Sequence, residues 1–407
     1  MKKFLLIAFK FPPYAGVGGF RWSKLCKYLA QMGHEIHVVT VRWKKMGPNT
    51  FIEDVNHPNI KIHQIESLYP HNIKYKSFNN KYLNKIKIIL WYLLNKFILS
   101  IFYFDDEAQR WGRTLIAYCE KLLKEENIKV VISTGHPFQA NRWAAVLKEK
   151  NPEIKLIQDF RDPWYEDPEV NKIKKIEEWQ RFSIAQADKV VAVTKGLLDL
   201  FLKKESKSKG YVIDNGYDKN DFYENLLKKR NQKLYDFIYL GNVACGRSEL
   251  LLKFIKSIRE IKDKIKIKKI LIISSYVPNF IQTEIEDLVQ TGLIELKPIM
   301  SQEKAFEYLV LSKYGLQLNA KVYPYLVSTK IYEYAMMKVP CVSLNYGGDI
   351  EDYFKKYDIG YSINVEKADL KKELIKLYKK PEKKFKFNIS KFYYKNLAKE
   401  YSKLING

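Results

Sequence analysis

A lysine and a glutamate, Lys330 and Glu333, stand three residues apart in the stretch "YLVSTKIYEYAMMKVPCVSL" (325–344). The stretch predicts a short turn, a helix that stops before a proline, and a buried strand. Ser328 or Thr329 can cap this helix, and the spacing then puts both charged side chains on one face near its start. Free N–H groups and a lysine attract phosphate there, while the carboxylate can accept hydrogen bonds from both hydroxyls of a ribose. We therefore expect a nucleoside diphosphate at this helix, in preference to a surface ion pair worth roughly 0.2–0.5 kcal/mol.

A second basic residue follows two glycines in "LGNVACGR" (240–247), which comes directly after an apolar strand. This residue, Arg247, is expected at the start of the next helix, where the positive end of the helix dipole disfavours a cation. A bound anion would offset this unfavourable interaction between Arg247 and the helix dipole. We expect Arg247 to act with Lys330 on the diphosphate, and the alternative is an arginine that points into solvent.

The loop "AGVGG" (15–19) lies between the first predicted strand and the first predicted helix. Gly18 and Gly19 would let the backbone approach a phosphate at the helix start, unless the loop is only a flexible turn. The loop is not a dinucleotide fingerprint, because Arg21 stands where the third glycine belongs. The second strand also ends without the acidic residue that holds an adenosine ribose. A nicotinamide-dependent dehydrogenase is therefore disfavoured.

Two further loops place polar side chains at strand ends in the first half of the chain. His136 in "STGHPF" could contact a reacting sugar or its acceptor, although an ordinary loop histidine would give the same pattern. Asp159, Arg161 and Asp162 in "QDFRDPW" could bind hydroxyls or act as a base, with a simple Asp159–Arg161 ion pair before a turn as the alternative. The two loops follow neighbouring strands, so we expect these four residues to form the catalytic group.

Metal and serine-hydrolase chemistry lack their usual signals in the sequence. No DxD pair follows an apolar strand, the histidines do not cluster, and there is no GxSxG segment. The four cysteines are scattered without a CxxC pair, which fits a reducing compartment. We expect no metal ligands.

Length and composition limit the fold class and the partners. A chain of 407 residues is too long for one ordinary core and predicts two domains of about 200 residues each. Its 46% hydrophobic and 14% aromatic residues argue against disorder. The formal net charge of +25 suits a phosphate ligand, an acidic lipid surface or nucleic acid, and a lysine-rich solvated surface explains it equally well. No nucleic-acid-binding motif is present, so we expect no nucleic acid.

Apolar strand patterns alternate with helix patterns along both halves of the chain, which predicts an α/β protein with two Rossmann-like doubly wound domains facing each other across a cleft. We place an N-terminal domain at 1–228, a C-terminal domain at 229–387 and a C-terminal helix at 388–407. The predicted strands are 4–9, 35–41, 130–134, 155–160, 189–194, 211–215, 236–242, 268–274, 294–298, 315–320 and 340–344.

One segment interrupts the alternation. "IKIILWYLLNKFILSIFYF" (86–104) is strongly apolar, but Lys87, Asn95 and Lys96 argue against a membrane span. It predicts either a helix that lies on an anionic bilayer or a helix that packs on the N-terminal domain. Interfacial aromatic residues and flanking lysines suit the first alternative: Trp91, Tyr92, Lys74, Lys76, Lys81, Lys85 and Lys87.

The N-terminal "MKKFLLIAF" has a basic start and a short apolar run, which Lys10 and two prolines end too early for a signal peptide. We read this run as the first strand of a cytoplasmic protein. A peripheral position on the inner face of the plasma membrane is the alternative to a freely cytoplasmic one.

Taken together, these motifs resemble glycosyltransferases of family 4 with the GT-B fold, the retaining group that builds bacterial polysaccharides and glycolipids. The resemblance implies that Glu333 holds the ribose and that Arg247 and Lys330 hold the diphosphate. It also implies that Gly18 and Gly19 approach the diphosphate from the other domain. By the same resemblance, the N-terminal domain (1–228) would bind the acceptor, the C-terminal domain (229–387) would bind the nucleotide sugar, and the C-terminal helix (388–407) would cross back to the N-terminal domain. The motifs that carry the resemblance are "FPPYAGVGGFRW", "STGHPF", "DFRDPW", "VIDNGYD", "YLGN…GR" and "TKIYEYAMMKVP".

The resemblance further implies that His136 touches the transferred sugar, that the sugar nucleotide is a substrate and that no separate cofactor is needed. The reaction would move a sugar to a hydroxyl of a glycan or glycolipid acceptor. One departure concerns the glutamate that this family often has eight positions before the ribose-binding glutamate, because Tyr325 stands there. The glutamate usually contacts the donor sugar, so a catalytically inactive sugar-nucleotide-binding partner of another enzyme is the alternative function.

Overall fold

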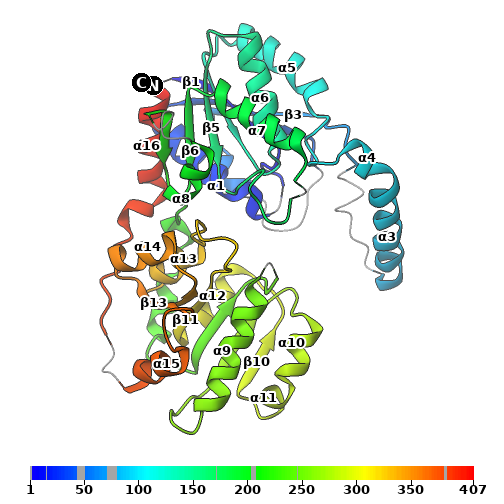
Figure 1. Cartoon of the computed structure of the whole chain (residues 1–407). Coiled ribbons are helices and arrows are strands. Elements are labelled where there is room, and N and C mark those ends of the chain that lie inside the picture. Colours follow the sequence, from blue (N-terminus) through cyan, green and yellow to red (C-terminus); the bar gives the residue numbers. More distant parts are fainter. Residues whose placement is uncertain are drawn as a thin grey trace. The chain divides into compact units, whose positions relative to one another are not determined.

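The chain folds into two compact α/β units. The computed structural model describes residues 2–14, 16–43, 51–70, 80–170, 172–202, 208–244, 246–379 and 383–407, with only the backbone for Val17 and Lys81 (Figure 1). Unit 1 comprises residues 1–214 and 394–407, and unit 2 comprises residues 215–393. The predicted two-domain α/β fold is thus confirmed, with one parallel sheet in each unit.

Unit 1 is built on a seven-stranded parallel sheet in the order β3-β2-β1-β4-β5-β6-β7. Every residue from Phe4 to Ala8 of β1 is fully buried, as expected for a central strand covered on both faces. The strand order reverses between β1 and β4, and ligands of such sheets bind beyond the carboxyl ends of the strands near this point. The strands are β1 (Lys3–Ala8), β2 (Glu35–Val41), β3 (Ile60–Ile65), β4 (Val130–Thr134), β5 (Lys155–Phe160), β6 (Lys189–Ala192) and β7 (Gly210–Val212).

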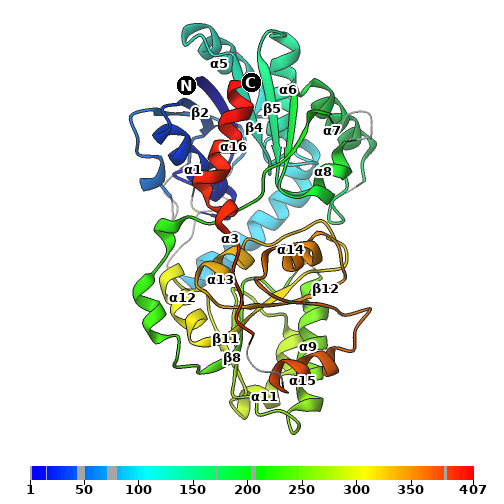
Figure 2. The ribbon, with the colours of Figure 1, turned by 90° about the vertical axis from the view of Figure 1, so that its left-hand side faces the viewer.

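Helices flank this sheet on both faces, and the last of them comes from the end of the chain. α16 lies beside α1, where Tyr401 meets Trp22 with ring centroids 5.1 Å apart (Figure 2). The helices of unit 1 are α1 (Val17–Gln31), η1 (Glu53–Val55), α3 (Lys81–Leu94), the π-helical turn η2 (Asn95–Leu99), α4 (Ser100–Phe102), α5 (Gly112–Glu125), α6 (Gln139–Lys150), α7 (Lys174–Gln186), α8 (Lys195–Phe201) and α16 (Tyr394–Asn406).

Unit 2 repeats the architecture with a six-stranded parallel sheet in the order β10-β9-β8-β11-β12-β13. Its strands are β8 (Tyr235–Leu240), β9 (Ile270–Ile273), β10 (Ile294–Lys297), β11 (Ser312–Leu318), β12 (Cys341–Asn345) and β13 (Gly360–Asn364). Its helices are η4 (Lys219–Asp221), η5 (Glu224–Lys229), α9 (Arg247–Ile261), α10 (Asn279–Glu284), α11 (Glu286–Gln290), α12 (Gln302–Val310), α13 (Lys330–Met336), α14 (Asp349–Tyr357), α15 (Leu370–Lys379) and η6 (Ser390–Phe392).

The boundaries between the units differ from those that we expected. The first boundary lies at 214/215 rather than 228/229, and the second lies at 393/394 rather than 387/388. The segment from 215 belongs to unit 2 because Leu226 packs in its core and the Tyr217 N–H donates to the Phe392 carbonyl oxygen at 3.0 Å. The polar, basic stretch near residue 230 is therefore part of unit 2 and does not connect two domains.

The apolar segment 86–104 lies mostly in α3, η2 and α4. The Trp91 ring of α3 lies 6.1 Å from the Tyr69 ring and Leu99 of η2 is buried, but most of the large apolar side chains of the segment are exposed. Tyr82 is 77% exposed and Ile101 is 70% exposed, which contradicts the alternative of a buried helix. Within the described residues, no helix combines the length and apolar character that a membrane span requires. Lys74 and Lys76 lie outside the described residues.

Candidate functional site

Lys330 and Glu333 lie at the carboxyl edge of the unit 2 sheet, on α13. Lys330 is the first residue of this helix, and its Nζ lies 4.9 Å from the centre of the Tyr239 ring on β8. A Cβ placed on Gly241, just after β8, would lie 2.5 Å from the same Nζ. The lysine therefore reaches from α13 to the end of β8, and glycine at 241 leaves the space that it needs.

The two charged groups of α13 do not neutralise each other. Within the described part of the chain, Lys330 and Glu333 form no mutual ion pair, and the Glu333 carboxylate has no hydrogen-bond partner. Both side chains are half-buried. The simple surface ion pair that we considered as an alternative is therefore absent, and a partly desolvated carboxylate is left with unused acceptor positions.

Burial shifts the proton affinities of both groups. It raises the pKa of Glu333 to about 7, with Asp221 adding to the rise and Lys330 opposing it. It lowers the pKa of Lys330 to about 8, with Arg247 adding to the fall and Glu333 opposing it. Two groups whose charged forms are destabilised by burial and that do not pair with each other are typical of a site that a ligand completes.

Arg247 joins this site as the first residue of α9. Its Nη1 makes only a long contact of 3.4 Å with the Ala244 carbonyl oxygen, and its charge contributes to the lowered pKa of Lys330. Gly246 precedes it with φ +73°, and a Cβ on this glycine would lie 2.9 Å from the Ala320 Cβ beyond β11. The loop after β8 thus packs closely against the loop after β11. Arg247, Lys330 and Glu333 therefore lie at the same edge of the sheet.

The start of α13 is only weakly capped. The Ser328 hydroxyl accepts a hydrogen bond from the Lys330 N–H at 3.4 Å, and the Thr329 side chain makes no capping bond. The site thus depends mainly on its three charged side chains.

At the carboxyl edge of the unit 1 sheet, the structure brings three of the four expected catalytic residues near one another. His136 is exposed in the loop after β4, and the Arg161 Nε donates to the carbonyl oxygen of the preceding residue, Gly135, at 3.1 Å. Burial raises the pKa of the half-buried Asp162, with Arg161 and Lys10 opposing the rise. These residues form a polar edge that a substrate could reach.

Asp159 does not belong to that accessible edge. It is fully buried, and its oxygens accept hydrogen bonds from Trp22 Nε1 at 2.8 Å, from Thr134 Oγ1 at 3.1 Å and from Tyr401, besides an ion pair with Arg21 at 3.2 Å. Burial alone would raise its pKa, but Arg21 and the hydrogen bonds lower it. A role of Asp159 in binding hydroxyls or as a base is therefore inconsistent with its buried position. The alternative of an Asp159–Arg161 ion pair is also inconsistent with the structure, because Asp159 pairs with Arg21.

Gly18 and Gly19 lie in the first turn of α1. A Cβ on Gly18 would lie 2.8 Å from the Lys10 Cδ, so this glycine accommodates a lysine of the preceding loop. A Cβ on Gly19 would meet nothing closer than 3.7 Å. Gly18 is thus needed for packing within unit 1, whereas Gly19 carries no comparable constraint.

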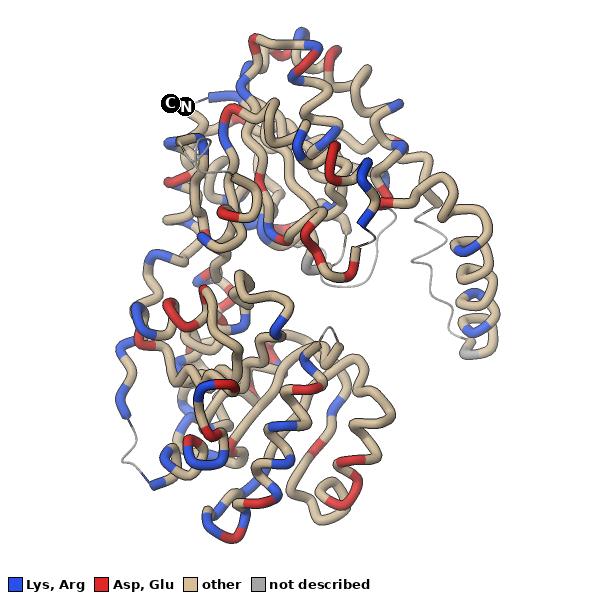
Figure 3. Tube along the Cα trace, in the orientation of Figure 1, with Lys and Arg blue, Asp and Glu red and all other residues tan. Residues whose placement is uncertain are grey.

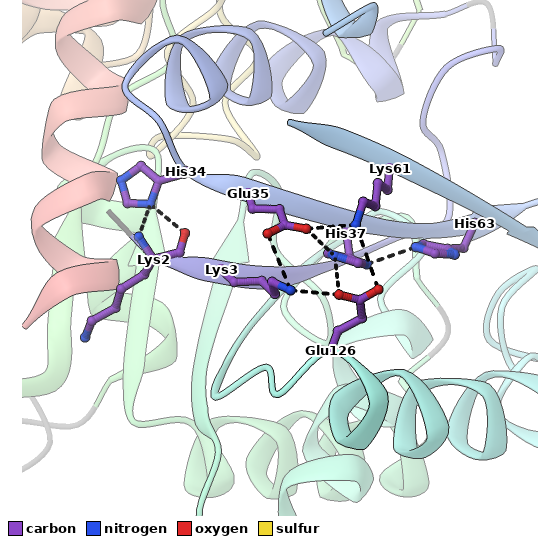
Figure 4. A network of polar contacts seen from close by, with 8 residues as sticks. All are labelled: Lys2, Lys3, His34, Glu35, His37, Lys61, His63 and Glu126. Carbon is purple, nitrogen blue, oxygen red and sulfur yellow. Dashed lines mark hydrogen bonds and ion pairs between the residues drawn. The ribbon is translucent and has the colours of Figure 1, made fainter. Parts of the chain in front are cut away.

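Two histidines that are far apart in the sequence do meet in space, contrary to our expectation that the histidines do not cluster. His37 Nδ1 and His63 Nε2 are 3.1 Å apart on the neighbouring strands β2 and β3 (Figure 4). Glu35, His37 and Glu126 come close enough together to hold a metal ion. Two lysines already pair with the carboxylates, Lys3 with Glu126 at 2.7 Å and Lys61 with Glu35 at 2.9 Å, so this network is balanced without an ion.

Sequence reasoning missed the residues that support the expected ones. Tyr239 and Gly241 enclose Lys330, and Arg21 and Tyr401 enclose Asp159. The sequence did indicate that Arg21 needs a partner, because it is a cation within the apolar pattern of α1 and becomes buried when that helix packs. Tyr401 gave none, because a tyrosine on an amphipathic helix is ordinary.

Comparison with known proteins identifies the fold and gives a family match for part of the chain. A family model described as Glycosyltransferase Family 4 matches residues 21–221, most of unit 1 and just under half of the chain. The solved structure of a sucrose-phosphate synthase from Thermosynechococcus elongatus matches with a TM-score of 0.65 and 11% identity, over 100% of this chain and 98% of that one. The chain therefore has the GT-B fold, and its residues 21–221 are similar to Glycosyltransferase Family 4.

Other solved structures have the same fold. HepE from Anabaena, in complex with UDP, matches with a TM-score of 0.63 and 11% identity over 100% of both chains. The lipopolysaccharide outer core galactosyltransferase WaaB, in its apo form, matches with a TM-score of 0.60 and 13% identity, over 100% of this chain and 99% of that one. No curated protein sequence matches significantly. Lys330, Glu333 and Arg247 lie outside the residues that the family model covers.

Proposed function

We propose that this protein transfers a sugar from a nucleoside-diphosphate sugar to a hydroxyl group and keeps the anomeric configuration. The observation that carries the proposal is the half-buried pair on α13, Lys330 and Glu333, which do not neutralise each other and lie beside Arg247. A diphosphate would pair with the two cations, and the ribose hydroxyls would donate to the Glu333 carboxylate. The UDP-bound complexes of HepE, a protein of the same fold, support a uridine nucleotide as the first candidate.

In the proposed reaction, the bond between the sugar C1 and the terminal phosphate oxygen breaks while a bond from C1 to the acceptor hydroxyl oxygen forms. The hydroxyl proton passes to the departing phosphate on the same face of the sugar. Arg247 and Lys330 would stabilise the charge that develops on the diphosphate, and they would do so without a metal ion. We therefore expect transfer to continue in excess EDTA.

We assign His136, Arg161 and Asp162 of unit 1 to substrate orientation. His136 would contact the transferred sugar, and Arg161 and Asp162 would bind hydroxyls of a glycan acceptor, for which a lipid-linked glycan is our choice. Asp159 has no part in this assignment, because its acceptor positions are already occupied.

Titration calorimetry with UDP tests the nucleotide site. Glu333→Gln and Lys330→Met should each weaken binding about 10- to 100-fold, because each removes a charge-assisted interaction worth roughly 1.5–3 kcal/mol. The matched controls are Glu303→Gln on α12, whose side chain is exposed, and Lys338→Met just beyond the other end of α13, and both should bind like the unmodified protein. Unchanged affinity in both site variants would contradict the proposal.

The second candidate function is a sugar-nucleotide-binding partner without activity of its own, which Tyr325 at the position of the donor-contacting glutamate favours. Donor hydrolysis separates the two candidates. Sugar release from a nucleotide sugar, lost in Lys330→Met, supports the transferase. Tight nucleotide binding without release from any donor supports the partner.

A further inference from the structure

The helical segment 81–102, formed by α3, η2 and α4, exposes a long apolar surface. Large apolar side chains that would normally be buried are in contact with solvent along its whole length, and Ile88, Leu90 and Phe97 are each 60% exposed or more. Contiguous apolar surface of this extent marks a place where a protein meets another apolar phase. Figure 1 shows α3 standing away from the sheet of unit 1.

Helical geometry collects part of this surface into one stripe. Residues spaced by three, four or seven positions lie on the same side of a helix, at 100° per residue. Asn84 and Asn95 lie on the opposite side, together with Ile88 and Trp91, so the asparagines mark the side that faces away from the stripe. The stripe consists of Leu83, Ile86, Ile89, Leu90, Leu93 and Phe97, and all six side chains are exposed.

Lysines border the stripe, and acids are absent. Lys85 and Lys96 lie eleven residues apart along one edge of it, and the Lys96 Nζ lies 5.5 Å from the centre of the Phe97 ring. No aspartate or glutamate occurs anywhere between Glu66 and Asp105 (Figure 3). A lysine whose stem follows an apolar stripe can place its ammonium group at the level of lipid headgroups while the stripe enters the acyl region.

The charges beside the stripe indicate whether a second copy of the chain or a lipid bilayer covers it. A second copy of this chain that packed stripe to stripe would bring Lys85 and Lys96 toward their counterparts, with no acid in the segment to compensate them. An anionic bilayer supplies both an apolar interior for the stripe and negative headgroups for the lysines. The net charge of +25 favours the same surface at longer range.

The base of the segment is fixed to unit 1. The Tyr103 hydroxyl donates to the Leu68 carbonyl oxygen at 2.6 Å, and the Arg110 guanidinium lies 4.6 Å from the Phe102 ring centre and donates from Nε to the Phe102 carbonyl oxygen at 3.3 Å. These contacts hold the end of the segment while its stripe stays uncovered.

We propose that segment 81–102 is an interfacial membrane anchor that lies flat on an anionic bilayer through the stripe, with Lys85 and Lys96 at the headgroups. This surface lies on a different unit from the nucleotide site and does not depend on the proposed transfer reaction. Binding should occur with or without UDP, so failure of one proposal leaves the other standing.

Sedimentation of the full chain with vesicles tests the anchor. The protein should pellet with mixed phosphatidylglycerol–phosphatidylcholine vesicles much more than with phosphatidylcholine alone. Ile89→Asn combined with Leu93→Asn should lower this binding by about tenfold or more, because two apolar side chains no longer enter the bilayer. Lys85→Glu combined with Lys96→Glu should lower binding to the anionic vesicles by a similar factor and leave the weak binding to neutral vesicles unchanged.

The matched control replaces two exposed apolar residues of unit 2, Phe280→Asn with Ile299→Asn, which should bind like the unmodified protein. An environment-sensitive dye on Leu90→Cys should shift to the blue with anionic vesicles, whereas the dye on Asn95→Cys, away from the stripe, should not. Equal pelleting with anionic and neutral vesicles would overturn the proposal. A concentration-dependent dimer that Ile89→Asn with Leu93→Asn abolishes, without vesicle binding, would overturn it in favour of a second copy.

Discussion

Asp159 in unit 1 and Glu333 in unit 2 are both carboxylates close to the carboxyl edge of a parallel sheet, and both have a basic residue near them, yet their surroundings are opposite. Asp159 is fully buried, accepts hydrogen bonds from three elements and has a lowered pKa. Glu333 is half-buried, and burial raises its pKa to about 7. A carboxylate that the fold has already satisfied holds elements together, whereas one that the fold leaves unsatisfied is available to a ligand.

The largest expected effect is a loss of stability when Asp159, the carboxylate with many partners, is replaced. Asp159→Asn should destabilise unit 1 by roughly 3–5 kcal/mol, because it leaves the charge of Arg21 buried without its partner. Thermal unfolding followed by circular dichroism measures the loss, and UDP affinity of the folded protein should not change. A variant that unfolds at the normal temperature but has lost transfer activity would instead return Asp159 to the catalytic group.

Glu333→Gln should change stability in the opposite direction. The folded-state pKa of about 7 lies above the ordinary value of 4.5, so ionising Glu333 costs stability as pH rises from 4.5 through 7. Glutamine removes that cost, and the variant should be more stable than the unmodified protein by on the order of 1 kcal/mol at pH values above 7, discounted for partial exposure. The gain should vanish below pH 4.5, and thermal unfolding across this range would show it; equal stability at high pH would mean that Glu333 has a partner.

The smallest effect is the pH dependence of nucleotide affinity. Binding needs the carboxylate of Glu333 and the ammonium of Lys330, whose pKa values are about 7 and about 8. UDP affinity should rise as pH increases toward 7 and fall as pH increases beyond 8. In Glu333→Gln the rise attributable to this residue should disappear while the fall remains. Calorimetry at several pH values compares the two proteins, and identical profiles would contradict the assignment.

The sequence predicted those parts of the fold that local pattern determines. Continuous apolar runs located β1 and β2 closely, and the three-residue spacing put Lys330 and Glu333 on one helix face. β3 escaped prediction, because Ile60–Ile65 is a half-buried edge strand that mixes isoleucine with lysine, histidine and glutamine and lacks the continuous apolar run of the buried strands. β13 with its flanking helices, α14 and α15, also lay beyond the elements that we predicted.

The partners of the charged residues could not be predicted. Asp159 contacts Arg21, which is 138 residues away in the sequence, and Tyr401, which is 242 residues away. No residue near Asp159 in the sequence indicates either contact. The ion pair that we considered as the alternative for Asp159 was with Arg161, which is close in the sequence, whereas the fold supplied the more distant Arg21. Similarly, the space beside Gly241 that Lys330 occupies arises only when α13 packs against the end of β8.

The placement of α16 affects the order in which the chain can mature during synthesis. Unit 2 is made from a continuous stretch of chain, whereas unit 1 needs Tyr401 from α16, which is translated after all of unit 2. Most of unit 1 therefore leaves the ribosome before unit 2, but unit 1 can complete its folding only after unit 2 has been synthesised. Until then the Arg21–Asp159 pair lacks one of its hydrogen-bond partners, so a chain arrested before α16 would present an incomplete unit 1 to the quality-control machinery of the cell.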